Sequence, residues 1–127
     1  MRKLLVLAAV SGLLVPALFV GTASAHVKKT ETTLTIDSSP SGNQVLVFGK
    51  IKPKKCALGQ KVKVYDAGPG SDRVLGSDRL DNDGEYSVRV PADSGRVYAK
   101  VKSAVIVSNY QHTHKCKGDK SPTINVS

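Results

Sequence analysis

Two histidines and a cysteine near the carboxyl terminus have the types and spacing of metal ligands. His112, His114 and Cys116 occupy alternate positions, so their side chains point the same way if the segment is extended. Imidazole and thiolate groups are ligands that zinc and copper prefer. A disulfide would consume Cys116, however, and the neighbouring Lys115 and Lys117 are typical of an exposed loop. A metal site and ordinary surface histidines therefore both stay open here.

The first 25 residues have the pattern of a secretory signal peptide. Arg2 and Lys3 precede an apolar run over 4–20, and an Ala-Ser-Ala cleavage motif ends at Ala25. An uncleaved anchor is the alternative, although the run is shorter than the roughly 20 residues that span a bilayer. We expect cleavage after Ala25, secretion, a mature domain over 26–127, and no membrane association after cleavage.

Cleavage at that point adds a second set of metal-binding nitrogens. His26 becomes the first residue, and its α-amino group and ring can chelate one ion that His112 or His114 completes. A copper- or zinc-binding secreted protein that uses this terminal histidine is therefore the alternative function. The main interpretation assigns no cofactor to the chain.

The acidic run from Asp81 to Glu85 contains the oxygen ligands of a calcium loop, and Asp78 lies near enough to add one. The run lacks the spacing and the distal glutamate of an EF-hand. Its Asp83-Gly84 pair is typical of a tight turn between two strands. We interpret the run as a hairpin turn.

Side-chain catalysis has little support in this sequence. No serine lies in the Gly-x-Ser-x-Gly pattern of a nucleophile elbow. The carboxylates available as an acid–base pair, such as Asp81 and Asp83, fall in the same solvated turn. We expect no enzymatic activity.

The chain is basic. Its net charge is +9, and loss of Arg2 and Lys3 with the signal peptide lowers it to +7. Strand parity groups lysines and tyrosines on two polar faces, Lys61, Lys63 and Tyr65 on one and Tyr98, Lys100 and Lys102 on the other. Such faces can bind an anionic polymer by charge and by ring stacking. A merely lysine-rich surface is the alternative, and no nucleic acid is expected because the chain has no recognition motif.

The elements that must position these residues are strands. Apolar and polar residues alternate over 61–65, 86–90 and 97–102, as half-buried strands require. Weaker strand patterns occupy 30–36, 44–51, 73–80, 105–110 and 123–126, and turn clusters occupy 38–43, 67–71, 81–84 and 91–95. Seven or eight antiparallel strands in this order predict one all-β domain, an Ig-like two-sheet sandwich.

The two cysteines, Cys56 and Cys116, are expected to form a disulfide. An even count in a secreted chain indicates pairing rather than metal or redox chemistry. A bridge that closes a loop of about 60 residues stabilises a fold by about 4 kcal/mol on the chain-entropy model.

The order of several short motifs resembles that of a known family. The motifs are Phe48-Gly49-Lys50-Ile51, Cys56, the strand 61–65, the turn 81–86, Tyr98-Ala99-Lys100-Val101, Cys116 and Ser121. They look like the small secreted prealbumin-like domains of high-GC Gram-positive bacteria, which are similar to carboxypeptidase regulatory-like and Cna-B-like modules. The resemblance covers most of 32–126. It implies a Greek-key sandwich, a Cys56–Cys116 bridge and no catalytic residues.

Many Cna-B-like domains also carry a Lys-to-Asn isopeptide bond between their first and last strands. Lys28 or Lys29 and Asn125 are the formal candidates here, but no acidic catalyst for that bond is evident in the sequence.

Together these patterns predict a secreted, non-enzymatic structural or interaction module of the cell envelope or extracellular space. The expected partner is an anionic cell-wall polymer or an envelope protein.

Overall fold

The structure is a computed structural model that describes residues 26–70, 72–109 and 112–127. The predicted signal peptide, residues 1–25, lies outside the described residues. Strands dominate, and the helical structure within the described ranges is one turn of 3-10 helix, η1 (Lys54–Cys56). No helix in this part of the chain is long and apolar enough to cross a membrane. The strands are β1 (His26–Thr30), β2 (Thr33–Leu34), β3 (Asp37–Ser41), β4 (Gln44–Lys52), β5 (Lys61–Asp66), β6 (Arg73–Arg79), β7 (Glu85–Pro91), β8 (Arg96–Val101), β9 (Ala104–Asn109), β10 (His112–Cys116), β11 (Asp119–Lys120) and β12 (Ile124–Asn125).

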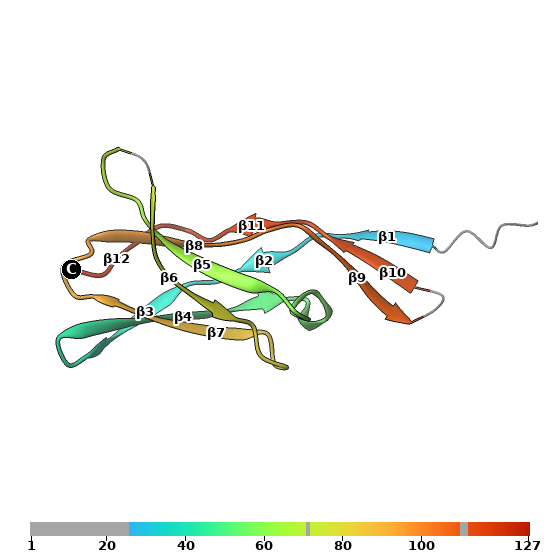
Figure 1. Ribbon diagram of the computed structural model, residues 1–127, viewed down its shortest axis with the longest axis horizontal. Coiled ribbons are helices and arrows are strands. Elements are labelled where there is room, and N and C mark those ends of the chain that lie inside the picture. Colours follow the sequence, from blue (N-terminus) through green and yellow to red (C-terminus); the bar gives the residue numbers. More distant parts are fainter. Residues whose placement is uncertain (1–25, 71, 110–111) are drawn as a thin grey trace, which may run out of the picture.

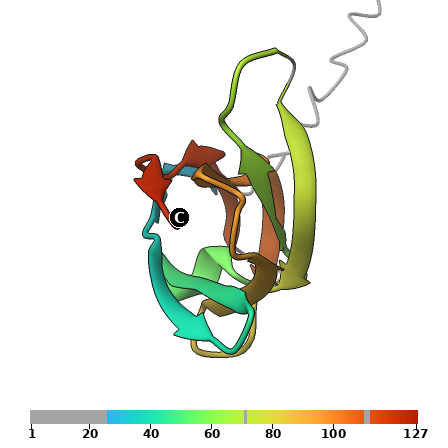
Figure 2. The same cartoon turned by 90° about the vertical axis from the view of Figure 1, so that its left-hand side faces the viewer.

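Two sheets wrap around one apolar core (Figure 2). The first has the strand order β11-β8-β5-β6, and β12 also pairs with β8. In the second, β4 pairs with β7 along one edge and with β2 and β3 along the other. Strand β7 alternates between exposed and buried residues over its whole length, as the period of two requires. The predicted all-β, sandwich-like fold with antiparallel sheets is confirmed, and the Greek-key order stays a prediction.

The core is built mainly from small β-branched side chains. Val47, Val62, Val64, Val90 and Val97 are fully buried, and they come from four strands of the two sheets. β-branched residues favour strands because their stiff side chains pack well on a pleated surface. The core therefore fixes which face of each strand points outward.

The predicted strand over 30–36 is not continuous. The chain leaves β1 after Thr30, pairs briefly as β2, and starts β3 at Asp37. The Asp119 side chain stabilises the short strand β2 next to this break, because its carboxylate accepts a hydrogen bond of 2.8 Å from the Leu34 amide. The partner lies 85 residues away in the sequence, so no local pattern predicts it.

The predicted turn over 38–43 is mostly strand. Ser38 to Ser41 pair with β4, and the turn is confined to residues 42 and 43. Strand β3 is an edge strand that pairs only with β4 among the described strands, so proline, which has no amide hydrogen, is tolerated at position 40.

A third sheet extends beyond the sandwich as an arm (Figure 1). Its order is β1-β10-β9, and β10 runs antiparallel to β9 but parallel to β1. The parallel pair is an exception to the predicted antiparallel arrangement. The prediction of an exposed loop around Lys115 is also wrong, because Lys115 lies within β10. Parallel strands need a long connection. Most of the chain separates β1 from β10.

The arm is joined to the sandwich by the disulfide. Cys56 of η1 and Cys116 of β10 are bonded, with their Cα atoms 5.8 Å apart, and both are buried. This confirms the predicted pairing.

The described residues contain twelve strand segments, more than the seven or eight predicted. The segments that the sequence analysis did not predict as strands are β1, β3, β10 and β11, whereas β2 and β12 fall within the predicted stretches 30–36 and 123–126. Strand β11 is two residues long and has no periodicity of its own, so its pairing with β8 defines it.

Candidate functional site

The outer face of the first sheet carries rows of basic side chains. Lys63 of β5 is the register partner of Lys100 of β8, and Lys100 is in turn the partner of Lys120 of β11. Two residues along β5, Lys61 pairs with Arg79 of β6. We call the resulting group the basic face, and it consists of Lys61, Lys63, Arg79, Lys100, Lys102 and Lys120.

Four of these lysines surround a shallow concavity of about 400 Å³. Lys61, Lys63, Lys100 and Lys102 line it together with Tyr65. The side chains of this face are exposed, except that Lys63 is half-buried. Like charges directly opposite each other on neighbouring strands destabilise a sheet. Fold stability therefore does not account for this arrangement, and an anionic ligand would relieve the repulsion.

Two stacked tyrosines border the basic face. Tyr65 and Tyr98 are register partners, and their rings are stacked with centroids 5.2 Å apart and an interplanar angle of 11°. The Lys120 Nζ lies 4.1 Å from the centroid of the Tyr98 ring. Tyr98 is 6% exposed, whereas Tyr65 is half-buried. The Tyr98 ring therefore packs against Tyr65 and Lys120, and the ring of Tyr65 is the more accessible of the two tyrosine rings to a ligand.

The Tyr98 hydroxyl donates a hydrogen bond to the Asp72 carboxylate. The pKa of Tyr98 is raised to about 12, mainly by this hydrogen bond. Burial of the side chain and the negative charge of Asp72 raise the pKa further. The same contact ties the segment between β5 and β6 to the sheet.

The structure unites two groups that the sequence analysis separates. Lys61, Lys63 and Tyr65 were assigned to one polar face and Tyr98, Lys100 and Lys102 to another, but the β5–β8 register places all six on a single face. Strand parity shows which residues share a face of one strand, whereas the pairing of two strands depends on the fold. Sequence reasoning also missed Lys120, because β11 is too short to be predicted, and Arg79, because only the pairing of β6 with β5 brings it to this face.

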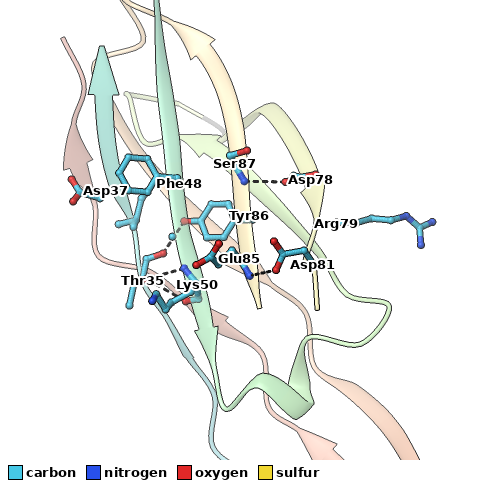
Figure 3. A pocket seen from close by; sticks show the side chains of 12 residues that line it. Thr35, Asp37, Phe48, Lys50, Asp78, Arg79, Asp81, Glu85, Tyr86 and Ser87 are labelled. Atoms are coloured by element: carbon cyan, nitrogen blue, oxygen red, sulfur yellow. Dashed lines mark hydrogen bonds between the residues drawn. The ribbon is translucent and has the colours of Figure 1, made fainter. Parts of the chain in front are cut away.

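A second hollow lies on the outer face of the other sheet (Figure 3). It has a volume of about 730 Å³ and lies around Phe48 of β4. Phe48 is half-buried and pairs with Asp37 of β3 and Ser87 of β7, which stand on either side of its ring in Figure 3. We call this hollow the Phe48 groove, and the sequence analysis did not identify it.

The acidic run forms the predicted hairpin turn between β6 and β7. The Asp81 Oδ1 accepts hydrogen bonds from the amides of Asp83 and Glu85, both at 2.9 Å. Gly84 has a φ of +77°, which favours glycine. The Asp78 Oδ2 accepts the Ser87 amide at 2.9 Å. These carboxylates thus stabilise the hairpin. The described part of the chain contains no cluster of three or more His, Cys, Asp or Glu that could hold a metal ion.

The arm brings the candidate metal-binding histidines into one backbone neighbourhood. His26 and His112 are register partners in the parallel β1–β10 pair, and Lys28 is the partner of His114. The side chains of His26 and His112 lie outside the described part of the structure. Cys116 is committed to the disulfide and has no free thiolate to offer.

The formal isopeptide candidates are far apart. Lys28 and Lys29 belong to β1 and Asn125 to β12, and the two strands lie at opposite ends of the long axis (Figure 1). The described fold therefore does not bring these residues together.

Comparison with known proteins found no match among family models, curated proteins or solved structures.

Proposed function

We propose that this chain is a secreted, non-enzymatic interaction module whose basic face binds an anionic polymer of the cell envelope. The observation that carries the proposal is the register of Lys63, Lys100 and Lys120 across three neighbouring strands. An envelope protein with an acidic surface is the alternative partner. The resemblance to secreted prealbumin-like domains supports the same placement of the protein outside the cell.

The geometry of the basic face suits a chain of repeated charges. Side chains of the same parity are about 6.7 Å apart along a strand, and neighbouring strands are about 4.8 Å apart. Two rows of cations at these spacings can contact several anionic groups of one polymer at once. Lysine ammonium groups are compact point charges with flexible stems, which tolerate a polymer of irregular conformation.

The test is binding to purified cell-wall material over a range of salt concentrations. Exposed charges are screened over about 8 Å at physiological ionic strength, so binding should weaken steeply as salt is added. The double variant Lys63→Glu, Lys100→Glu should bind at least tenfold more weakly than the parent protein.

A matched control separates the basic face from net charge. Lys28→Glu with Lys29→Glu makes the same charge change on exposed residues of the arm. Equal losses for the two double variants would show that net charge alone drives adsorption. No binding at low salt would reject the polymer proposal and would favour a protein partner.

A second candidate function is copper or zinc binding by the arm. The register of His26 with His112 favours it, because cleavage after Ala25 would place the new α-amino group next to β10. Imidazole and amine nitrogens would hold the ion, which would supply Lewis-acid or redox chemistry when bound.

Copper titration of secreted protein, whose start at His26 is first confirmed by intact mass, tests this candidate. Tight binding should disappear when one residue is added before His26, because the α-amine then becomes an amide. Equal affinity in both proteins would eliminate the terminal-histidine site.

A further inference from the structure

The Phe48 groove is a second candidate binding site, and its lining differs in charge from the basic face. We propose that it binds a saccharide that carries a free amino group. The groove lies on the outer face of the β3-β4-β7 sheet, so this inference goes beyond the polymer binding proposed for the β5-β8 face.

An aromatic ring forms the middle of the groove. Phe48 points away from the core, because its neighbour Val47 is fully buried and strand residues alternate between faces. The side chains on either side of the ring, Asp37 and Ser87, are short and polar. A ring between short neighbours presents apolar surface, against which the C–H face of a sugar ring can pack.

The acidic groups of the groove are four carboxylates, those of Asp37, Asp78, Asp81 and Glu85. Ionised carboxylates only accept hydrogen bonds. The Asp81 Oδ1 is fixed by two backbone amides, which leaves Oδ2 available, and the Asp37 Oδ1 accepts the Ser38 amide at 2.8 Å. The side chain of Glu85 forms no hydrogen bond or ion pair with the described residues. A ligand for this lining must supply donors, such as hydroxyl and ammonium groups.

Charge favours an ammonium group among those donors. Four carboxylates line the groove, against two cations, Lys50 and Arg79. Figure 3 shows the Arg79 side chain directed away from the groove, and Lys50 is the register partner of Glu85 but forms no ion pair with it. An ammonium group can interact with both a carboxylate and the face of Phe48. A saccharide with a free amine combines the ring, the hydroxyl donors and the positive charge.

An extended peptide fits this place less well. Strand β4, which carries Phe48, is paired on both edges, with β3 and with β7, so a peptide that lies over Phe48 cannot pair with β4 through its backbone. The volume of about 730 Å³ falls within the usual range for small-ligand sites, which is about 300–1,000 Å³. A short oligosaccharide is of this size.

The test is calorimetric titration of the secreted protein with a tetramer of β-1,4-linked glucosamine at mildly acidic pH. The fully N-acetylated tetramer has the same backbone but no positive charge, and it should bind at least tenfold more weakly. Glu85→Gln and Phe48→Leu should each reduce affinity for glucosamine tetramer by a similar factor. Asp93→Asn removes an equal charge from an exposed turn and should leave the affinity unchanged.

The outcomes separate this site from general attraction and from the basic face. Equal binding of the acetylated tetramer, equal effects of Glu85→Gln and Asp93→Asn, or equally tight binding of tetralysine would each overturn the proposal. Glu85 is exposed, so Glu85→Gln reports on binding even if Phe48→Leu lowers stability. The Lys63→Glu, Lys100→Glu variant, which tests the polymer proposal, should retain glucosamine binding.

Discussion

The hydroxyl of Tyr86 donates a hydrogen bond of 2.7 Å to the backbone carbonyl of Thr35. Tyr86 lies on β7 and pairs with Gly49 of β4, and its ring passes the position where a larger residue would carry a side chain. A Cβ at Gly49 would lie 2.1 Å from the Thr35 oxygen and 3.0 Å from the Tyr86 ring. This contact therefore connects β7 and β4 to the link between β2 and β3, along the lining of the Phe48 groove.

Removal of that hydroxyl should destabilise the fold moderately. Tyr86→Phe leaves the Thr35 carbonyl without this donor, which costs about 1–2 kcal/mol in the free energy of unfolding. Gly49→Ala should cost more, because backbone atoms must move. Denaturant unfolding measures both, and a Gly49→Ala variant as stable as the parent would contradict the described geometry.

The strands were largely predictable, whereas their partners were not. The alternation in β5 and β7 reflects one face toward the core and one face outward, and both faces are visible in a local stretch of sequence. In β8 the outward-facing Tyr98 is buried against Tyr65 and Lys120, which the sequence pattern does not show. The pairing of Lys63 with Lys100 depends on the register between two strands 37 residues apart, which follows from the fold as a whole. The Phe48 groove was missed for the same reason, since its lining comes from β3, β4, β6 and β7.

Loss of the disulfide should destabilise the arm more than the sandwich. Replacement of Cys56 and Cys116 by Ser removes a link across 60 residues, which contributes about 4 kcal/mol on the chain-entropy model. Hydrogen exchange should then increase most in β9 and β10, because Cys116 anchors β10 to η1. Unchanged melting and uniform exchange would show that the link has no such role.

Tyr98 should ionise well above the usual range for tyrosine. Its pKa is raised to about 12, mainly by the hydrogen bond to Asp72, because that bond favours the neutral phenol. The resulting stabilisation is complete below the unfolded pKa of about 10 and is lost as the pH rises through about 12. Asp72→Asn should lower the pKa of Tyr98, as followed by ultraviolet absorbance, with Tyr98→Phe identifying the transition. An unchanged titration in Asp72→Asn would contradict the contact.

The facing lysines of the basic face should make stability depend on salt. Lys63 and Lys100 are direct register partners, and opposed like charges destabilise a strand pair by a few tenths of a kcal/mol up to about 1 kcal/mol. Added salt screens this repulsion and should raise the melting temperature of the parent protein. Lys63→Gln removes the repulsion while it keeps a long side chain, so it should be more stable at low salt and respond less to added salt. Lys28→Gln on the arm is the control for net charge. If both variants respond to salt alike, the repulsion is spread over the whole molecule. If only Lys63→Gln loses the dependence of its melting temperature on salt, and it also binds cell-wall material more weakly, the Lys63–Lys100 pair both limits stability and supports binding.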